Sequence, residues 1–239
     1  QKAQWSSVNA EIDPFKYSSW PLNGNVQAWA VTQAVERRLA ALEKAGRLRG
    51  MPPLLAMQSV VDSTVVVPKL ITVLFDRLES ESNELFLFDI NRLDRLSNLL
   101  NRSFAQTVVP KLQRTDLHYR LTALKNAQIE SPEVVVQTRQ WGSTSEEAVD
   151  MSWPEGVVSL SHIAVPFSPD DPIYGASDAT ADTGLSLGTL GMRAEPSALS
   201  IPSSVFVRCR HNPFYALMED RVVDWLSEVV GGTESCRGA

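Results

Sequence analysis

The 239-residue sequence has little of what marks a membrane protein or a nucleic-acid-binding protein. Its apolar runs are short: Leu54–Met57 and Val65–Val67 are far below the roughly 20 residues that a membrane-spanning helix needs. Basic residues are not in excess, since the formal net charge is −6, whereas nucleic-acid binding generally requires a basic surface. We therefore expect no membrane-spanning segment and no nucleic acid partner.

Cysteine is equally scarce, with only Cys209 and Cys236 in the chain. Neither has the Cys-x-x-Cys or Cys/His spacing of a structural zinc site. One buried thiol and one tail thiol is the favoured interpretation, and a disulfide between the two stays open. No motif indicates a metal ion or an organic cofactor, so we expect none.

A charged segment followed by an apolar one, typical of a secretory signal, is also missing at the start of the chain. The composition, 44% hydrophobic and 21% charged, is that of a soluble protein with one large domain or two small ones. It fits a cytoplasmic or a periplasmic protein equally well. The stretch through Pro21 is rich in turn formers and predicts a loop, and an amphipathic helix follows from about Asn25 and stops before Gly46.

The middle of the chain predicts an α/β fold. Met51–Gln58 is a short apolar run that is typical of a buried strand, Val67–Leu78 is a helix with proline in its first turn, and Glu84–Asp89 is another strand. This order implies parallel strands joined by a right-handed crossover.

The remaining segments alternate in the same manner. We expect helices over 91–111 and 215–230, strands over 118–124, 133–137, 156–161 and 205–210, a polar loop over 141–154, and a flexible tail over 231–239.

Two residues follow strands in this scheme, at the positions where active sites gather. Asp62 lies just past the first predicted strand, and His162 comes directly after the strand 156–161. In open α/β sheets, ligands and catalytic side chains lie at the carboxyl ends of the strands. Each has a plain structural alternative, since Asp62 could be a turn or helix-capping residue and His162 a buried structural histidine.

Five segments resemble one bacterial family of α/β-hydrolases, the serine aminopeptidase and monoacylglycerol-lipase-like hydrolases. They are Asp13-Pro-Phe-Lys-Tyr17, Leu55-Ala-Met-Gln-Ser-Val-Val-Asp62, Ser159-Leu-Ser-His162, Pro169-Asp-Asp-Pro-Ile-Tyr-Gly175 and Asn212-Pro-Phe-Tyr215. The resemblance covers most of residues 1–230. It implies an α/β-hydrolase-like fold in which residues 1–50 form a cap or lid segment and residues 51–230 form the C-terminal part of the core.

The resemblance implies that His162 is the general base and Asp62 the acid that orients it. The chain order of such a triad places the serine before both residues, on a Gly-x-Ser-x-Gly turn between a strand and a helix, and no such turn precedes residue 58. We therefore expect the nucleophile upstream of Gln1, on a missing N-terminal segment or a partner chain. The separation of 100 residues between Asp62 and His162 also indicates an insertion before the base.

Other residues compete for these roles. Asp170 and Asp171 are near His162 in sequence, but their Pro-Asp-Asp-Pro setting predicts a turn. Ser186 lies in Gly184-Leu-Ser-Leu-Gly188, which fits the nucleophile pattern but has no strand before it.

His118 and His211 are expected to be structural or surface groups. Ser161 is not expected to assist His162, because adjacent strand residues point to opposite faces.

The expected function is that of a serine-dependent hydrolase acting on carboxylic esters or small amides and peptides, an esterase-, lipase- or peptidase-like enzyme that could be inactive as this chain alone. A half sheet would expose an unpaired edge and an apolar face, which another polypeptide segment should cover. The alternative is a non-catalytic α/β protein that binds a ligand or takes part in assembly.

Overall fold

The computed structural model describes residues 4–8, 13, 15, 17, 19–62, 65–78, 80–92, 110, 113–160, 165–176, 189–191 and 207–235. The chain divides into two compact units, residues 1–51 and 52–239. The first unit nearly coincides with the segment 1–50 whose role as a cap stays a prediction.

Unit 1 is a small hairpin followed by a long helix. Strands β1 (Trp5–Ser7) and β2 (Trp20–Pro21) pair antiparallel, and α1 (Leu22–Lys44) follows at once. The helix ends before Gly46, as expected, where a φ of 66° favours glycine, and a short 3-10 turn, η1 (Leu48–Gly50), follows. The expectation that the opening stretch is entirely loop was wrong, because strands of two or three residues are too short to leave a period in the sequence.

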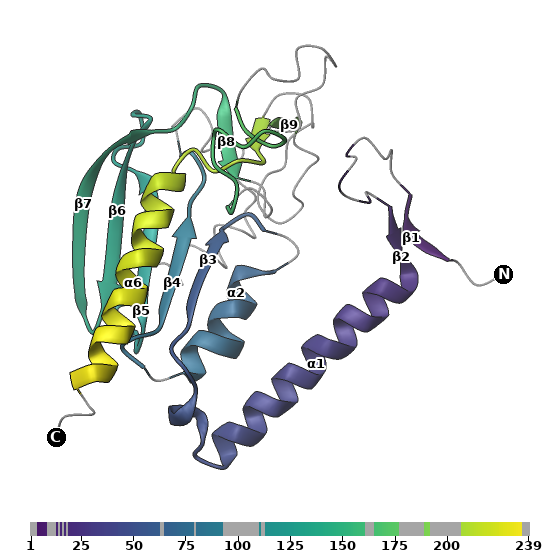
Figure 1. Cartoon of the computed structure of the whole chain (residues 1–239), viewed down its shortest axis with the longest axis vertical. Helices are drawn as coiled ribbons and strands as arrows, with labels where there is room; N and C mark the ends of the chain where they lie inside the picture. Colours follow the sequence, from purple (N-terminus) through teal and green to yellow (C-terminus); the bar gives the residue numbers. More distant parts are fainter. Residues whose placement is uncertain are drawn as a thin grey trace. The chain divides into compact units, whose positions relative to one another are not determined.

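Unit 2 contains a five-stranded mixed sheet in the order β3-β4-β5-β6-β7 (Figure 1). Its strands are β3 (Leu55–Ser59), β4 (Glu84–Phe88), β5 (Arg120–Asn126), β6 (Glu133–Gln140) and β7 (Ser143–Ser152). Strands β3, β4 and β5 run parallel to one another, β6 is antiparallel to β5, and β7 is antiparallel to β6. The expected α/β class and the parallel β-α-β unit are therefore confirmed.

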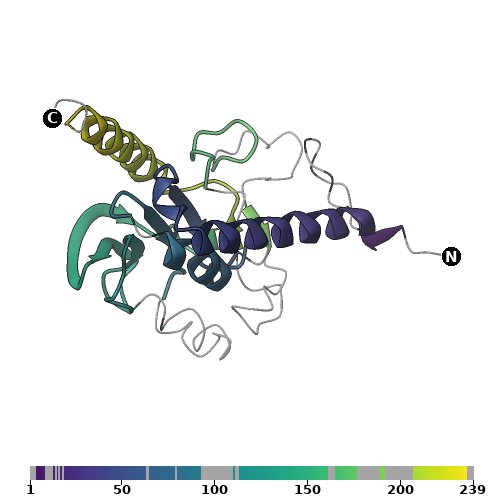
Figure 2. The same cartoon turned by 90° about the horizontal axis from the view of Figure 1, so that it is seen from below.

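Helices cover both faces of this sheet. A continuous helical segment joins β3 to β4 and changes from α2 (Val67–Lys69) through a π-helical stretch, η2 (Leu70–Leu74), to a 3-10 turn, η3 (Phe75–Arg77). Its Ile71 packs against one face of β4, and α6 (Tyr215–Ser235) packs Leu217 against the other face. Figure 2 shows these helical elements on opposite sides of the strands. Successive β4 residues therefore alternate between two cores.

The segment 141–154, expected to be a polar loop, is mostly strand β7. Trp141 and Gly142, with φ of 51° and 76°, form the tight turn between β6 and β7. No strand pattern is visible in this part of the sequence because β7 is an edge strand that is exposed along most of its length, with only Val149 and Met151 packed on the core. The helix expected to end at 230 continues to Ser235, so the first five residues of the expected flexible tail are helical. Gly231 and Gly232 do not end this helix, because a glycine inside a helix costs only about 1 kcal/mol of stability.

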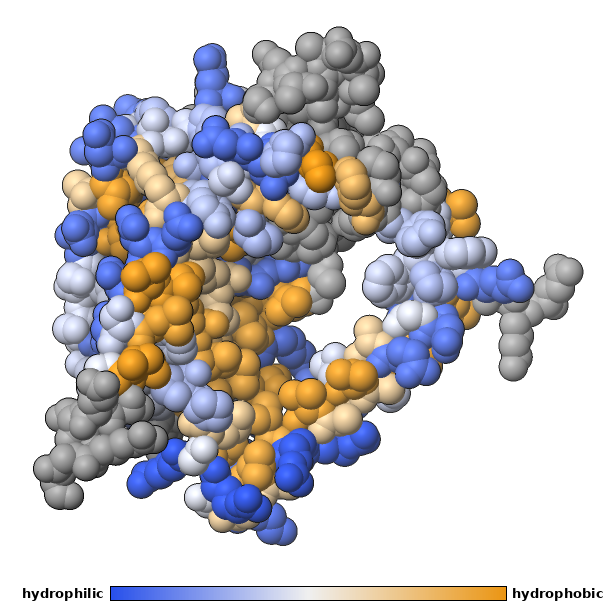
Figure 3. All heavy atoms as spheres, viewed as in Figure 1, coloured by the Kyte–Doolittle hydropathy of each residue, from blue (hydrophilic) through white to orange (hydrophobic). Residues whose placement is uncertain are grey.

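The two edges of the sheet differ in chemistry. The outer strand β7 carries Glu146, Glu147 and Asp150, and such charges discourage pairing with another strand. Strand β3 carries no charge. Leu54 and Val60 bond β4 through their backbone groups, and the backbone groups of successive strand residues point to alternate sides. The backbone groups of Leu55 and Met57 therefore point away from β4. No described residue pairs with β3 on that side. Apolar side chains gather over β3 and the neighbouring helical segment (Figure 3).

A second, three-stranded sheet lies beside the carboxyl ends of β3 and β4. It has the order β8-β10-β9, built from β8 (Val157–Leu160), β9 (Thr189–Gly191) and β10 (Val207–Cys209), with β10 parallel to β8. The strands expected over 156–161 and 205–210 correspond to β8 and β10. Most of the helix expected over 91–111 lies outside the described residues.

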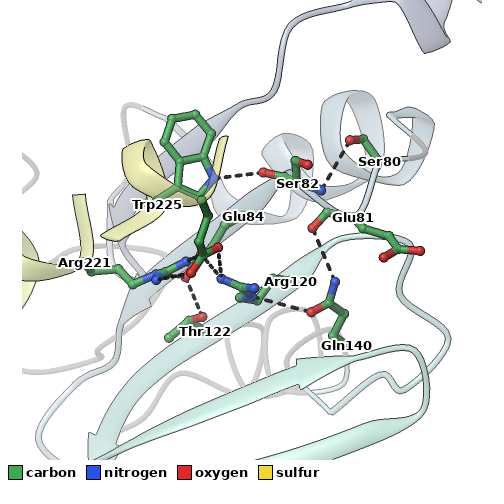
Figure 4. Close-up of polar contacts among 10 residues, drawn as sticks. Ser80, Glu81, Ser82, Glu84, Arg120, Thr122, Gln140, Arg221 and Trp225 are labelled. Carbon is green, nitrogen blue, oxygen red and sulfur yellow. Dashed lines mark hydrogen bonds and ion pairs between the residues drawn. The ribbon is translucent and has the colours of Figure 1, made fainter. Parts of the chain in front are cut away.

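A buried carboxylate joins α6 to the sheet. Glu84, only 1% exposed at the start of β4, accepts hydrogen bonds from Arg221 on α6 (2.7 Å), from Arg120 (3.3 Å) and from the Thr122 hydroxyl (2.7 Å). Both arginines also bond Glu228, and Trp225 donates to the Ser82 carbonyl (Figure 4). Burial acts to lower the pKa of Arg221, but its bonds to Glu84 and Glu228 outweigh this and raise the pKa.

Replacing Glu84 with glutamine should destabilise unit 2, because two partly buried guanidinium groups would lose the carboxylate between them. We expect Glu84→Gln to lower the free energy of unfolding by about 3 kcal/mol, measured by urea denaturation followed by circular dichroism. Glu228→Gln, at the exposed rim of the same cluster, is the matched control and should cost less than about 1 kcal/mol. Equal losses in the two variants would contradict a central role for Glu84.

Candidate functional site

Asp62 lies in a tight turn just past β3, where the sequence placed it. It is 7% exposed, and its backbone N–H donates to the Ser59 carbonyl at 3.1 Å. Its Oδ1 accepts the Val65 N–H at 3.1 Å, and its Oδ2 accepts the Gln58 side-chain amide in a short hydrogen bond. Both donors are neutral groups, and together they orient the carboxylate.

Strand β8 ends beside β3, although the two strands belong to different sheets. The Ser59 hydroxyl donates to the Leu160 carbonyl at 3.1 Å, a contact between residues 101 positions apart. Leu160 is two residues before His162. His162 itself, with Ser161, lies outside the described residues. Leu160, two residues before His162, therefore lies within hydrogen-bonding distance of Ser59, the last residue of the strand that precedes Asp62.

A second carboxylate lies at the same edge of the sheet. Asp89 follows β4, is 5% exposed and forms a two-point ion pair with Arg92, whose Nη2 donates to Oδ1 at 2.8 Å. From its sequence pattern, Asp89 is expected only to end a strand. An aspartate followed three residues later by arginine was the available signal for this pair. Because a guanidinium neutralises it, Asp89 is less suited than Asp62 to support a cationic imidazole.

Two buried asparagines connect β4, β5 and β8. Asn91 donates from its backbone N–H to the Val158 carbonyl (2.8 Å) and from its side chain to the Val157 carbonyl (3.0 Å). Asn126, at the end of β5, donates to the Asn91 side-chain oxygen (2.9 Å). Sequence reasoning missed both residues, because asparagines near strand ends more often indicate turns.

The segment after His162 forms a compact turn over residues 165–176. Asp171 accepts the backbone N–H groups of Ile173 (2.9 Å) and Tyr174 (2.8 Å) through Oδ1, while Asp170 is exposed. Asp171 is thus a turn-capping residue, as its Pro-Asp-Asp-Pro setting indicated. Gly175 closes the turn so tightly that a Cβ there would lie 2.3 Å from the Asp171 carbonyl oxygen.

Residues that follow β10 hold this turn. Arg210 stacks over the Tyr174 ring at 4.3 Å, and His211 approaches the Tyr174 carbonyl through Nδ1 at 3.1 Å. Asn212 donates its backbone N–H to the Phe167 carbonyl (2.6 Å) and its side-chain amide to the Val165 carbonyl (3.4 Å). His211 is therefore buried in a structural contact, which agrees with its expected role.

The other candidates are less prominent. His118 is exposed and packs edge-on against Trp141, with ring centroids 5.3 Å apart. Ser186 lies outside the described residues. Cys209 is a free thiol, so it is not joined to Cys236, and burial raises the pKa of Cys209 to about 12, which makes it unreactive near neutral pH.

Taken together, the described side chains at this edge offer a buried, oriented carboxylate next to the end of β8. Among the described residues there is no group of histidine, cysteine and acidic side chains that could hold a metal ion. No helix in the described part of the chain is long and apolar enough to cross a membrane. A buried carboxylate such as that of Asp62 can stabilise a positive charge or assist a proton transfer.

Comparison of the chain with protein-family models, with curated proteins and with solved structures gave no match in any of the three.

The turn after His162 should not tolerate a side chain at residue 175. We expect Gly175→Ala to lower the free energy of unfolding by about 2 kcal/mol, because the added Cβ meets backbone oxygens that cannot move without opening the turn. Urea denaturation gives the measurement. Gly231→Ala, with open space around residue 231 on α6, should be neutral or stabilising by up to about 1 kcal/mol. An unchanged midpoint for Gly175→Ala would contradict the tight packing of this turn.

Proposed function

We propose that this chain supplies the acid and the base of a serine-dependent hydrolase of the α/β-hydrolase type, with Asp62 as the acid and His162 as the base. Carboxylic esters or small amides are the substrate class. The observation that carries the proposal is the hydrogen bond between the Ser59 hydroxyl and the Leu160 carbonyl. This bond joins the ends of β3 and β8, the strands that precede Asp62 and His162, although 101 positions separate Ser59 from Leu160 in sequence.

The proposed chemistry divides the work between the two side chains. The His162 imidazole takes the proton from the attacking serine and returns it to the leaving alcohol or amine. The Asp62 carboxylate selects the imidazole tautomer and stabilises the imidazolium that forms.

Asp62 suits this role better than the other carboxylates nearby. Asp89 is neutralised by the guanidinium of Arg92, and Asp171 caps its own turn. Asp62 is buried, accepts hydrogen bonds from the Gln58 amide and the Val65 N–H, and follows the edge strand β3. Burial also excludes water, which strengthens the attraction between a carboxylate and an imidazolium.

The serine in this proposal belongs to polypeptide outside these 239 residues, an upstream segment or a partner chain. The uncharged edge of β3 supports this, because a parallel strand could bond the backbone groups of Leu55 and Met57. The carboxyl end of such a strand would lie beside Asp62, at the edge where active-site groups gather in α/β proteins. In the same proposal, residues 1–50 act as a cap.

The pairing of Asp62 with His162 can be tested on the chain by itself. We expect the pKa of the His162 imidazole to fall by roughly one pH unit in Asp62→Asn, because the carboxylate that stabilises the charged ring is lost. A proton–nitrogen NMR titration of histidine-labelled protein gives this pKa.

Asp171→Asn is the matched control for this titration. It removes a carboxylate nine residues from His162 but keeps an oxygen that can cap the turn, so the His162 titration should not change. A fall in the Asp171 variant together with no change in the Asp62 variant would make Asp171 the acid.

Fluorophosphonate labelling locates the serine. We expect no label on this chain alone. When the chain is produced with its upstream polypeptide, the label should map outside these 239 residues, and His162→Ala should slow labelling by roughly 10²–10⁴-fold through loss of the base. A label on Ser186 of the isolated chain would contradict the proposal and favour a self-contained enzyme.

A further inference from the structure

Buried side chains from elsewhere in the fold hold the described residues that come before and after His162 in sequence. At one end, the Ser59 hydroxyl on β3 bonds the Leu160 carbonyl at 3.1 Å. At the other, Asn212 bonds the carbonyls of Val165 and Phe167. Ser59 is 1% exposed and Asn212 is fully buried.

These contacts do not belong to the regular ladders. Strand β8 pairs with β10 and not with β3, so the Ser59 hydroxyl connects two separate sheets. Asn212 follows β10 and directs both its backbone N–H and its side-chain amide toward the segment after His162. Its side-chain oxygen accepts the Phe214 N–H at 2.9 Å, which fixes the orientation of the amide.

Ser59 is also tied to the acid. Its carbonyl accepts the Asp62 N–H at 3.1 Å, while its hydroxyl bonds the Leu160 carbonyl. One residue therefore contacts both the turn that carries Asp62 and the strand that leads to His162. A small displacement of either element changes the separation between a carboxylate and an imidazole, to which their interaction is sensitive.

We propose that Ser59 and Asn212 are positioning residues, which fix the two ends of the His162 segment and thereby set the distance of the base from Asp62. This inference rests on the proposed function, since it takes His162 as the base and Asp62 as the acid. Neither residue contacts the substrate in this role. Ser59 acts from the end of β3, the strand that precedes Asp62. Asn212 acts on Val165 and Phe167, which come after His162 in sequence.

The test is the NMR titration of His162 in Ser59→Ala, compared with the wild-type chain and with Asp62→Asn. Ser59→Ala should lower the pKa of His162 by roughly half a pH unit, toward the value in Asp62→Asn, because a less constrained imidazole spends less time beside the carboxylate. Ser59→Thr keeps the hydroxyl and should restore the wild-type titration. The far-ultraviolet circular dichroism spectrum reports whether the fold is intact, and it should not change.

Asn212→Ser provides an independent variant at the other end. It keeps a short oxygen that can cap Phe214 but loses the amide that bonds Val165, and we expect the same direction of change in His162. If neither Ser59→Ala nor Asn212→Ser moves the His162 titration while Asp62→Asn does, the positioning role is wrong and the proposed function stands. If Asp62→Asn has no effect, the proposed pairing itself fails.

Discussion

Hydrogen bonds from buried side chains, rather than a continuous ladder, hold β8 against the carboxyl edge of the main sheet. Ser59 and Asn91 supply these bonds from the ends of β3 and β4. A buried amide or hydroxyl without a partner costs about 1–3 kcal/mol, so each of these groups needs the strand that it contacts. The geometry of the candidate site depends on this arrangement, because the elements that lead to the acid and the base come from different sheets.

The long interval between Asp62 and His162 is accommodated without disturbing that edge. After β4 the chain adds β5 in parallel and then β6 and β7 antiparallel, so the sheet grows sideways, away from β3. The chain returns through Trp153, whose backbone N–H donates to the Pro132 carbonyl. The Trp153 ring packs edge-on against Phe214. The extra strands widen the sheet and leave the carboxyl ends of β3 and β4 next to β8.

The sequence was sufficient for the features that depend on local pattern. The short apolar runs that became β3 and β4 and the helical pattern between them are visible within a short window of sequence. Strand β7 was missed because most of its side chains are polar and exposed, with only Val149 and Met151 packed on the core, and a strand at a sheet edge needs no alternation. The position of Asp62 at a strand end was predictable. Its contact with Gln58 was not, because it depends on the geometry of the turn after β3. The link from Ser59 to Leu160 was not predictable either, because it depends on how distant segments pack.

The ion-pair cluster at Glu84 also bears on how the chain is made. Arg221 follows Glu84 by 137 residues, so β4 leaves the ribosome long before the helix that neutralises its buried carboxylate. Until α6 is complete, Glu84 lacks the hydrogen bonds from Arg221, which disfavours full closure of the core on that face of β4. Contacts between such distant residues also slow folding, since a long loop must close before they form. The sheet thus reaches its final packing only when the last helix is synthesised, and a nascent chain without α6 leaves this face of β4 uncovered by that helix.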